Sequence, residues 1–129
     1  MRTASYLGMA LVLFLFAFSA AKAHEVTLAD GQVVNYKNWV NKNSKGCCND
    51  QHCRPVPVGF ERTREGQLEV LVIGKGVAEG QWAWCPILAT HYLKTGNVPN
   101  SSVSHYCVWE NAGTTPCGQL LCYQPETLY

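Results

Sequence analysis

Apolar and polar residues alternate over short stretches along most of the chain, which is typical of β-strands that bury one face. Residues 24–35 alternate loosely around an Asp-Gly pair, and this predicts a small hairpin or two edge strands. The clearest strand signals are residues 58–62 and 68–73. They flank the polar segment 64–67, which contains Glu-Gly, so a second hairpin is predicted there.

Two more alternating segments follow. Residues 81–85 predict a third strand with Trp82 and Trp84 on one face, because side chains alternate along a strand. We expect these two rings to fill the core of a domain poor in Phe, and the alternative is a paired aromatic surface for a sugar or a protein. Residues 103–109 and 119–123 predict a final hairpin with a long loop.

Helical signals are few. Residues 36–40 place apolar side chains at helical spacing and predict one turn, and residues 86–93 begin with a proline and predict a short helix. Residues 41–50 are polar and predict a loop, whereas two prolines keep residues 54–58 extended. The expected fold is therefore mainly β: a small antiparallel sheet of hairpins with one or two short helices, stabilised by disulfides.

The start of the chain has the pattern of a secretory signal. Arg2 precedes an apolar run over residues 7–18, and residues 21–23 form a small-x-small cleavage pattern. We expect residues 1–23 to be a signal peptide and residues 24–129 to be one small domain, periplasmic or secreted. The apolar run is short for a transmembrane helix, although an uncleaved anchor is the alternative.

Removing this leader changes the charge balance. Without Arg2 and Lys22, 8 basic residues remain against 9 acidic ones, and no basic cluster is left. This balance argues against binding to nucleic acid and against an electrostatic hold on anionic membranes. An envelope protein or a glycan is the kind of partner that remains.

Seven cysteines all follow the leader, and an exported chain meets an environment in which disulfides persist. The most specific expectation is a Cys107–Cys122 disulfide across the final hairpin. Cys53 can close the preceding loop onto Cys47 or Cys48, whereas a bond between those two neighbours is strained.

Cys85 and Cys117 remain, and they pair with each other or with whichever of Cys47 and Cys48 is not bonded to Cys53. Because seven is odd, one thiol is left over, and a thiol-active protein is one alternative function. The four-residue gaps from Cys48 to Cys53 and from Cys117 to Cys122 fit zinc spacing, but a tight double pair is missing. Structural disulfides are the preferred interpretation in this compartment.

Cleavage after residue 23 would place His24 at the mature N-terminus, where an α-amine and an imidazole together bind copper. Partners for such a metal site would be His52, His91 or His105. A metal-handling protein is thus a second alternative, although a terminal histidine also arises by chance. No acid pair, phosphate loop or thiol-protease pattern is found, so no catalytic residue and no cofactor is expected.

The cysteine-rich segment also carries a resemblance. Trp39, the run from Cys47 to Pro55, the later His105-Tyr106-Cys107 and the final Cys122-Tyr123 form a W…CC-x4-C-R-P…H-x-C…C-[YF] pattern. In this pattern the chain resembles a family of small exported proteins of alphaproteobacteria without an assigned activity. The resemblance implies export and a disulfide-supported β fold. Cys85 and Cys117 lie outside the family pattern, and two additions fit an extra bridge between them.

The sequence therefore predicts an exported, non-catalytic module with a binding or structural role in the cell envelope.

Overall fold

The computed structural model describes residues 25–48, 52–95 and 102–127, and in these segments the chain is mainly β. The strands are β1 (Glu25–Thr27), β2 (Val33–Asn35), β3 (Val40–Asn41), β4 (Cys53–Pro55), β5 (Glu61–Arg64), β6 (Gln67–Ile73), β7 (Trp82–Pro86), β8 (Leu93–Thr95), β9 (His105–Val108) and β10 (Leu120–Gln124). The helical elements are the 3-10 turns η1 (Gly76–Ala78), η2 (Ala89–His91) and η3 (Glu110–Ala112) and the single-turn helix α1 (Pro116–Gln119).

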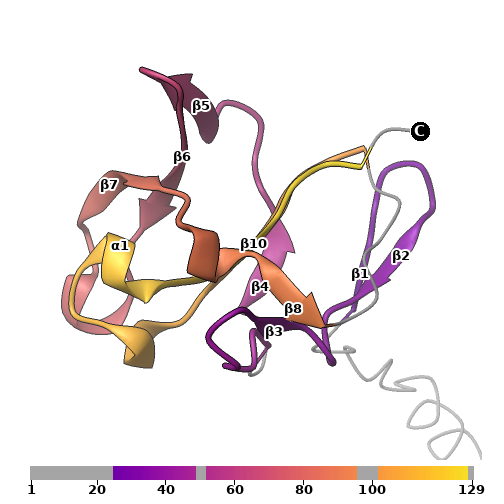
Figure 1. Cartoon of the computed structure of the whole chain (residues 1–129), viewed down its shortest axis with the longest axis horizontal. Coiled ribbons are helices and arrows are strands. Elements are labelled where there is room, and N and C mark those ends of the chain that lie inside the picture. The colour runs from indigo at the N-terminus through magenta and orange to yellow at the C-terminus, as the bar shows by residue number, and fades with distance from the viewer. Residues whose placement is uncertain (1–24, 49–51, 96–101, 128–129) are drawn as a thin grey trace, which may run out of the picture.

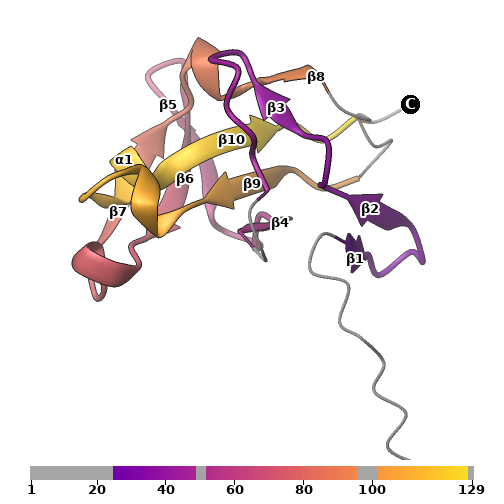
Figure 2. The same cartoon turned by 90° about the horizontal axis from the view of Figure 1, so that it is seen from below.

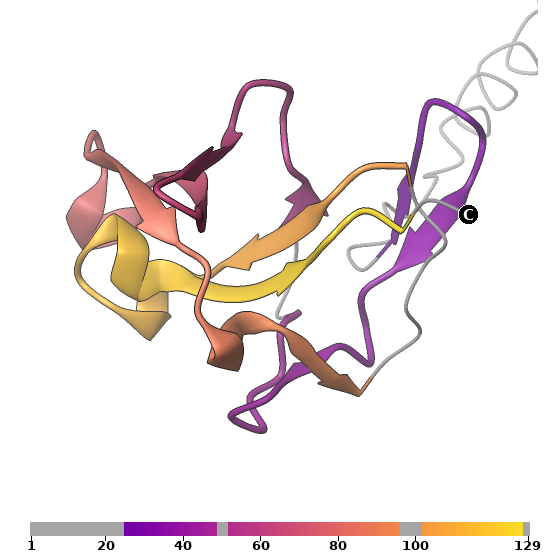
Figure 3. The same ribbon diagram turned by 45° about the horizontal axis from the view of Figure 1, so that its top comes forward.

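The strands form small antiparallel sheets rather than one large sheet. The pairings are β1-β2, β3-β8, β10-β9-β4 and β5-β6-β7. The β1-β2 hairpin and the β5-β6-β7 sheet lie at opposite ends of the molecule, with β9 and β10 between them (Figure 1). The views in Figures 2 and 3 show the same order, with β3 and β8 running along one side of the central pair.

The β9-β10 ribbon is the centre of the fold because all its residues are buried. On one of its faces, β10 and β9 contribute to a core cluster that also contains Val34, Tyr36 and Trp39. A second cluster includes Tyr106 and Tyr123 of the ribbon and buried residues of the β5-β6-β7 sheet. Both faces of the ribbon are thus covered, which explains why its sequence is apolar at nearly every position.

The hairpin predicted around residues 64–67 is confirmed, and its turn has a local cause. β5 pairs with β6 from Glu61↔Val70 to Arg64↔Gln67, which leaves Glu65 and Gly66 as a two-residue loop. Both loop residues have positive φ, 52° and 79°. A turn of this kind matches the twist of the two strands and favours glycine at its second position.

Three other predicted pairings or strands are also present: β1 with β2, β7 on β6, and β9 with β10. The two predicted helices are wrong. Residues 36–40 form a tight turn closed by the Trp39 amide and the Tyr36 carbonyl. Within residues 86–93 only the 3-10 turn η2 is helical, because β7 ends at Pro86 and β8 begins at Leu93. Trp39 is buried at 1% exposure in the first cluster, so tertiary packing rather than helical periodicity sets the conformation there.

The loop before β10 is held by a buried glutamine. Gln119 is fully buried, and its side-chain amide nitrogen Nε2 donates to the carbonyls of Lys75 and Gly113 at 2.8 and 3.2 Å. Its Oε1 accepts the Lys75 amide at 2.9 Å. The side chain therefore ties the β6–β7 connection to the loop that carries α1, where Thr115 caps the Gly118 amide.

Replacing this glutamine is expected to destabilise the fold. Gln119→Ala leaves the Lys75 amide and two carbonyls without their present partner, and a buried group left unsatisfied costs about 1–3 kcal/mol. We expect the free energy of unfolding to fall by about 2 kcal/mol in a urea titration. Gln67→Ala is the control, because Gln67 is exposed, and it should change stability by less than about 0.5 kcal/mol. Equal losses in the two variants would contradict this role of Gln119.

Candidate functional site

Three disulfides link the described segments. Cys47 bonds to Cys122 across 75 residues of sequence, Cys53 to Cys107 across 54, and Cys85 to Cys117 across 32. All six are half-buried or buried, and four of them belong to the first core cluster. Three disulfides fit an oxidising environment outside the cytosol.

The expected Cys107–Cys122 disulfide is wrong, although its geometric premise holds. Cys107 and Cys122 are register partners in β9 and β10, as predicted for a hairpin. β4 pairs with the other edge of β9, however, and this places Cys53 directly opposite Cys107. The expected closure of Cys53 onto Cys47 or Cys48 is wrong for the same reason. Of the partners left open for Cys85, the structure has Cys117.

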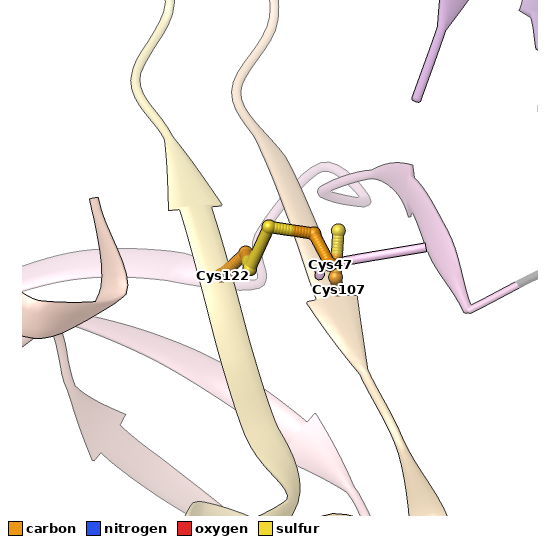
Figure 4. Close-up of side chains that lie close together, drawn as sticks. All are labelled: Cys47, Cys107 and Cys122. Atoms are coloured by element: carbon orange, nitrogen blue, oxygen red, sulfur yellow. A yellow bond between two sulfur atoms is a disulfide. The ribbon is translucent and has the colours of Figure 1, made fainter. Parts of the chain in front are cut away.

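The sulfur atoms of Cys47, Cys107 and Cys122 lie within 4.8 Å of one another. Figure 4 shows how they meet: Cys107 and Cys122 come from adjacent strands, and Cys47 reaches them from the loop after β3. A thiolate, not a disulfide sulfur, is the usual metal ligand. Because each of the three sulfurs is in a disulfide, this cluster does not offer a thiolate metal site.

Cys48 takes part in none of the three disulfides. It is half-buried and packs against the first core cluster, next to the bonded Cys47. The odd cysteine that the sequence implied is therefore at this position. Its neighbours after residue 48 lie outside the described residues.

The predicted copper ligand His24 also lies outside the described residues, so that site stays a prediction. The three histidines suggested as its partners have separate local environments. Among the described residues, no histidine belongs to a group of three or more metal-ligating side chains. His52 lies 6.0 Å from the Trp109 ring between centroids, and His91 ends the turn η2, where its Nδ1 accepts the Leu88 amide at 3.0 Å.

His105 lies in the core and is not available as a surface ligand. It is fully buried in β9, and its Nδ1 lies 2.8 Å from the Tyr36 hydroxyl. The rings of Tyr36 and Trp39 pack edge-on against it, with centroids at 5.6 and 5.8 Å. Burial disfavours the charged imidazolium and lowers the pKa of His105 to about 4. His105 is therefore neutral at pH 7, and burial raises the pKa of Tyr36 in the same environment.

A polar hollow of about 510 Å³ lies beside the turn after β3, with Lys45, His91 and Trp109 in its walls. Its best-placed amide is already used. Asn41 Oδ1 accepts the backbone amides of Asn43 and Lys45, and its Nδ2 donates to the Leu121 carbonyl. The Asn41 side chain thus serves the local turn and is not available to a ligand, so we rank this hollow below the apolar surface of the β5-β6-β7 sheet.

The outer face of the β5-β6-β7 sheet is the stronger candidate. Leu71 is opposite Trp84 and Ile73 is opposite Trp82. These four side chains border a shallow groove of about 400 Å³, which residues 80–81 also line. Trp82 is 66% exposed and Ile73 46%, so no described segment covers this end of the sheet. The opposite face carries Val70, Val72 and Cys85, and these three residues are completely buried.

The expectation that both tryptophans fill the core is therefore wrong. Alternation correctly placed Trp82 and Trp84 on one face, but it does not say which face meets solvent. The inner face is taken by smaller residues, which pack on the β9-β10 ribbon. The two tryptophan rings lie on the outer face because the other face of the sheet packs on this ribbon.

A charged pair borders the aromatic groove. The Arg62 guanidinium lies over the Trp84 ring, 4.1 Å from its centroid. The same side chain pairs with Glu69 on β6, with 2.8 Å between Nε and Oε1. Arg62 thus covers one tryptophan with a cation–π contact and leaves Trp82 as the exposed ring.

Comparison of the chain with protein-family models, with curated proteins and with solved structures finds no match. The resemblance to the alphaproteobacterial family thus stays a prediction. Within the segments that the structure describes, no helix is long and apolar enough to cross a membrane.

Proposed function

We propose that this protein is an exported, non-catalytic binding module of the cell envelope that docks a protein partner through the outer face of its β5-β6-β7 sheet. The observation that carries the proposal is the exposure of Trp82 beside Ile73 in an apolar groove. Soluble monomers rarely leave large apolar side chains together on one surface without a partner. The signal-peptide pattern and the three disulfides support the exported location.

The chemistry of this face favours a protein over a glycan. A sugar needs several hydrogen-bonding groups beside the ring on which it stacks, but apart from the two indoles Gln81 is the one described lining residue of the groove with a polar side chain. The nearest guanidinium, that of Arg62, is already occupied by Glu69 and Trp84. Tryptophan and arginine are enriched among the residues that dominate protein–protein binding energy.

The β5 edge of the same sheet is less suited to binding. β5 is an edge strand of sequence Glu-Arg-Thr-Arg, and charged side chains on an edge strand oppose the addition of a further strand. The face, not the edge, is therefore the expected contact.

Site-specific photocrosslinking in cells that produce the full chain tests the proposal. With p-benzoylphenylalanine at position 82, we expect one major protein adduct. Ile73→Lys in the same chain should reduce this adduct roughly tenfold, because a charge enters the apolar contact. The control is the same photoreactive residue at position 58, since Val58 is fully exposed and lies outside the groove.

Three outcomes would contradict this function. Equal adducts from positions 58 and 82 would indicate non-specific contact. An adduct that loses its mass shift only with glycosidases would identify a glycan, and an adduct of twice the chain mass would identify self-association.

Trp82→Ser should leave the free energy of unfolding within about 0.5 kcal/mol of the parent, which separates lost binding from lost folding.

A further inference from the structure

Two of the three disulfides meet at one place in the core. Cys47–Cys122 and Cys53–Cys107 are separate bonds, yet the sulfurs of Cys47, Cys107 and Cys122 lie within 4.8 Å of one another (Figure 4). Cys53 is outside this three-sulfur group, because its Sγ is directed toward the Cys47 carbonyl at 3.4 Å. The group therefore contains both ends of one disulfide and one end of the other.

Cys122 has two geometrically suitable partners. It is bonded to Cys47, and it is also the register partner of Cys107 in the antiparallel β9-β10 pair. Register partners project from the same face of a sheet, with side chains in contact. A rotation of the Cys107 side chain about χ1, between staggered rotamers, is the kind of movement that would bring its sulfur to Cys122.

The geometry points to a thiol–disulfide exchange site, in which a dithiol reductant that opens Cys53–Cys107 causes the Cys122 bond to pass from Cys47 to Cys107. Exposure identifies the point of entry. Cys53 is 8% exposed, whereas Cys107 and Cys122 are 0% and Cys47 is 1%. An attacking thiolate needs access to the sulfur it attacks, so Cys53, the most exposed of these four residues, is the expected point of attack on the two clustered disulfides.

Each step balances. The first thiolate of the dithiol bonds to Cys53, and Cys107 leaves as a thiolate. Cys107 attacks the Cys122 sulfur, the Cys107–Cys122 bond forms, and Cys47 leaves and takes up a proton. The second thiol of the reductant then displaces Cys53 as a thiol. Two electrons and two protons pass from the dithiol to the protein, which exchanges two disulfides for Cys107–Cys122 and thiols at Cys47 and Cys53.

A matched pair of variants isolates the exchange. Cys53→Ser and Cys107→Ser, each combined with Cys48→Ser, remove the same disulfide. Only Cys53→Ser leaves a thiol, that of Cys107, inside the three-sulfur group. After blocking with N-ethylmaleimide, digestion with trypsin and a Glu-specific protease separates Cys107 from Cys122 at Glu110. Cys47 and Cys53 remain in one peptide, so fragmentation of the linked peptides identifies the partner of Cys122.

We expect Cys53→Ser to contain the Cys107–Cys122 linkage at a level at least roughly tenfold above that of non-native linkages in Cys107→Ser. In Cys107→Ser, Cys47–Cys122 should persist. Retention of Cys47–Cys122 alone in both variants would overturn the proposal, and so would equal scrambling in both.

The unmodified protein provides a second test that does not depend on the folding of either variant. Limiting dithiothreitol under native conditions should produce an intermediate with alkylated Cys47 and Cys53 and a Cys107–Cys122 bond, whether or not Cys85–Cys117 is also reduced. An intermediate that instead has alkylated Cys53 and Cys107, with Cys47–Cys122 intact, would show simple reduction without exchange and would refute the site.

Discussion

Replacement of both Cys47 and Cys122 with alanine is expected to lower the free energy of unfolding by about 4 kcal/mol. This disulfide spans the longest separation of the three, 75 residues, so its loss releases the most conformational freedom in the unfolded chain. It also anchors the loop after β3 to the central strand β10. Urea unfolding followed by tryptophan fluorescence measures the change.

Cys48→Ala is the control for this variant. Cys48 is adjacent to Cys47 in sequence but is in none of the three disulfides, so its replacement should cost less than about 1 kcal/mol. A loss in Cys48→Ala as large as that in the double variant would mean that packing around residues 47–48, rather than the cross-link, supplies the stability.

Acidification from pH 6.5 to pH 4 is expected to remove about 3 kcal/mol of stability through His105. Its pKa in the folded protein is about 4, below the ordinary value of 6.5, because burial disfavours the charged ring. Above pH 6.5 both states are neutral at this position and the stability is complete. Between pH 6.5 and pH 4 only the unfolded state takes up the proton, and below pH 4 this group causes no further loss.

Urea titrations at pH 7, 5.5 and 4 measure this slope. His105→Asn is the matched variant, because an amide oxygen can replace Nδ1 as the neighbour of the Tyr36 hydroxyl but does not titrate. The variant should lose much less stability with acid than the parent does. Burial also lowers the pKa of His91, so a small residual slope of the same sign is expected. Parallel curves for parent and variant would refute the assignment to His105.

The tertiary structure also changes how the aromatic residues are interpreted. Tryptophan occurs both in the outer groove and in the buried core, yet Trp39 lies in the core and Trp82 in solvent. Residues 68–73 and 81–85 were correctly predicted as two strands, and the shared face of the tryptophans followed from it. Their availability for binding depends on the β9-β10 ribbon covering the other face.

Local signals in the sequence determined the hairpins. The Glu65-Gly66 turn, the alternation in β6 and β7 and the strands on either side of the α1 loop depend on contacts between neighbours in the chain. Such contacts are encoded within a few residues by turn geometry and by alternation, and both signals are visible in the sequence. The mainly β fold with its disulfides was predictable for this reason.

The tertiary structure alone decided the pairing of distant segments. β4 lies on β9 and β3 on β8, and neither strand pair is joined by a turn that could have predicted it. The β4-β9 register places Cys53 opposite Cys107 and leaves Cys122 to Cys47, so the disulfide partners follow from a contact that no local pattern encodes. Which face of a strand is buried is likewise a property of what packs against it, because alternation defines two faces and only the rest of the molecule covers one of them.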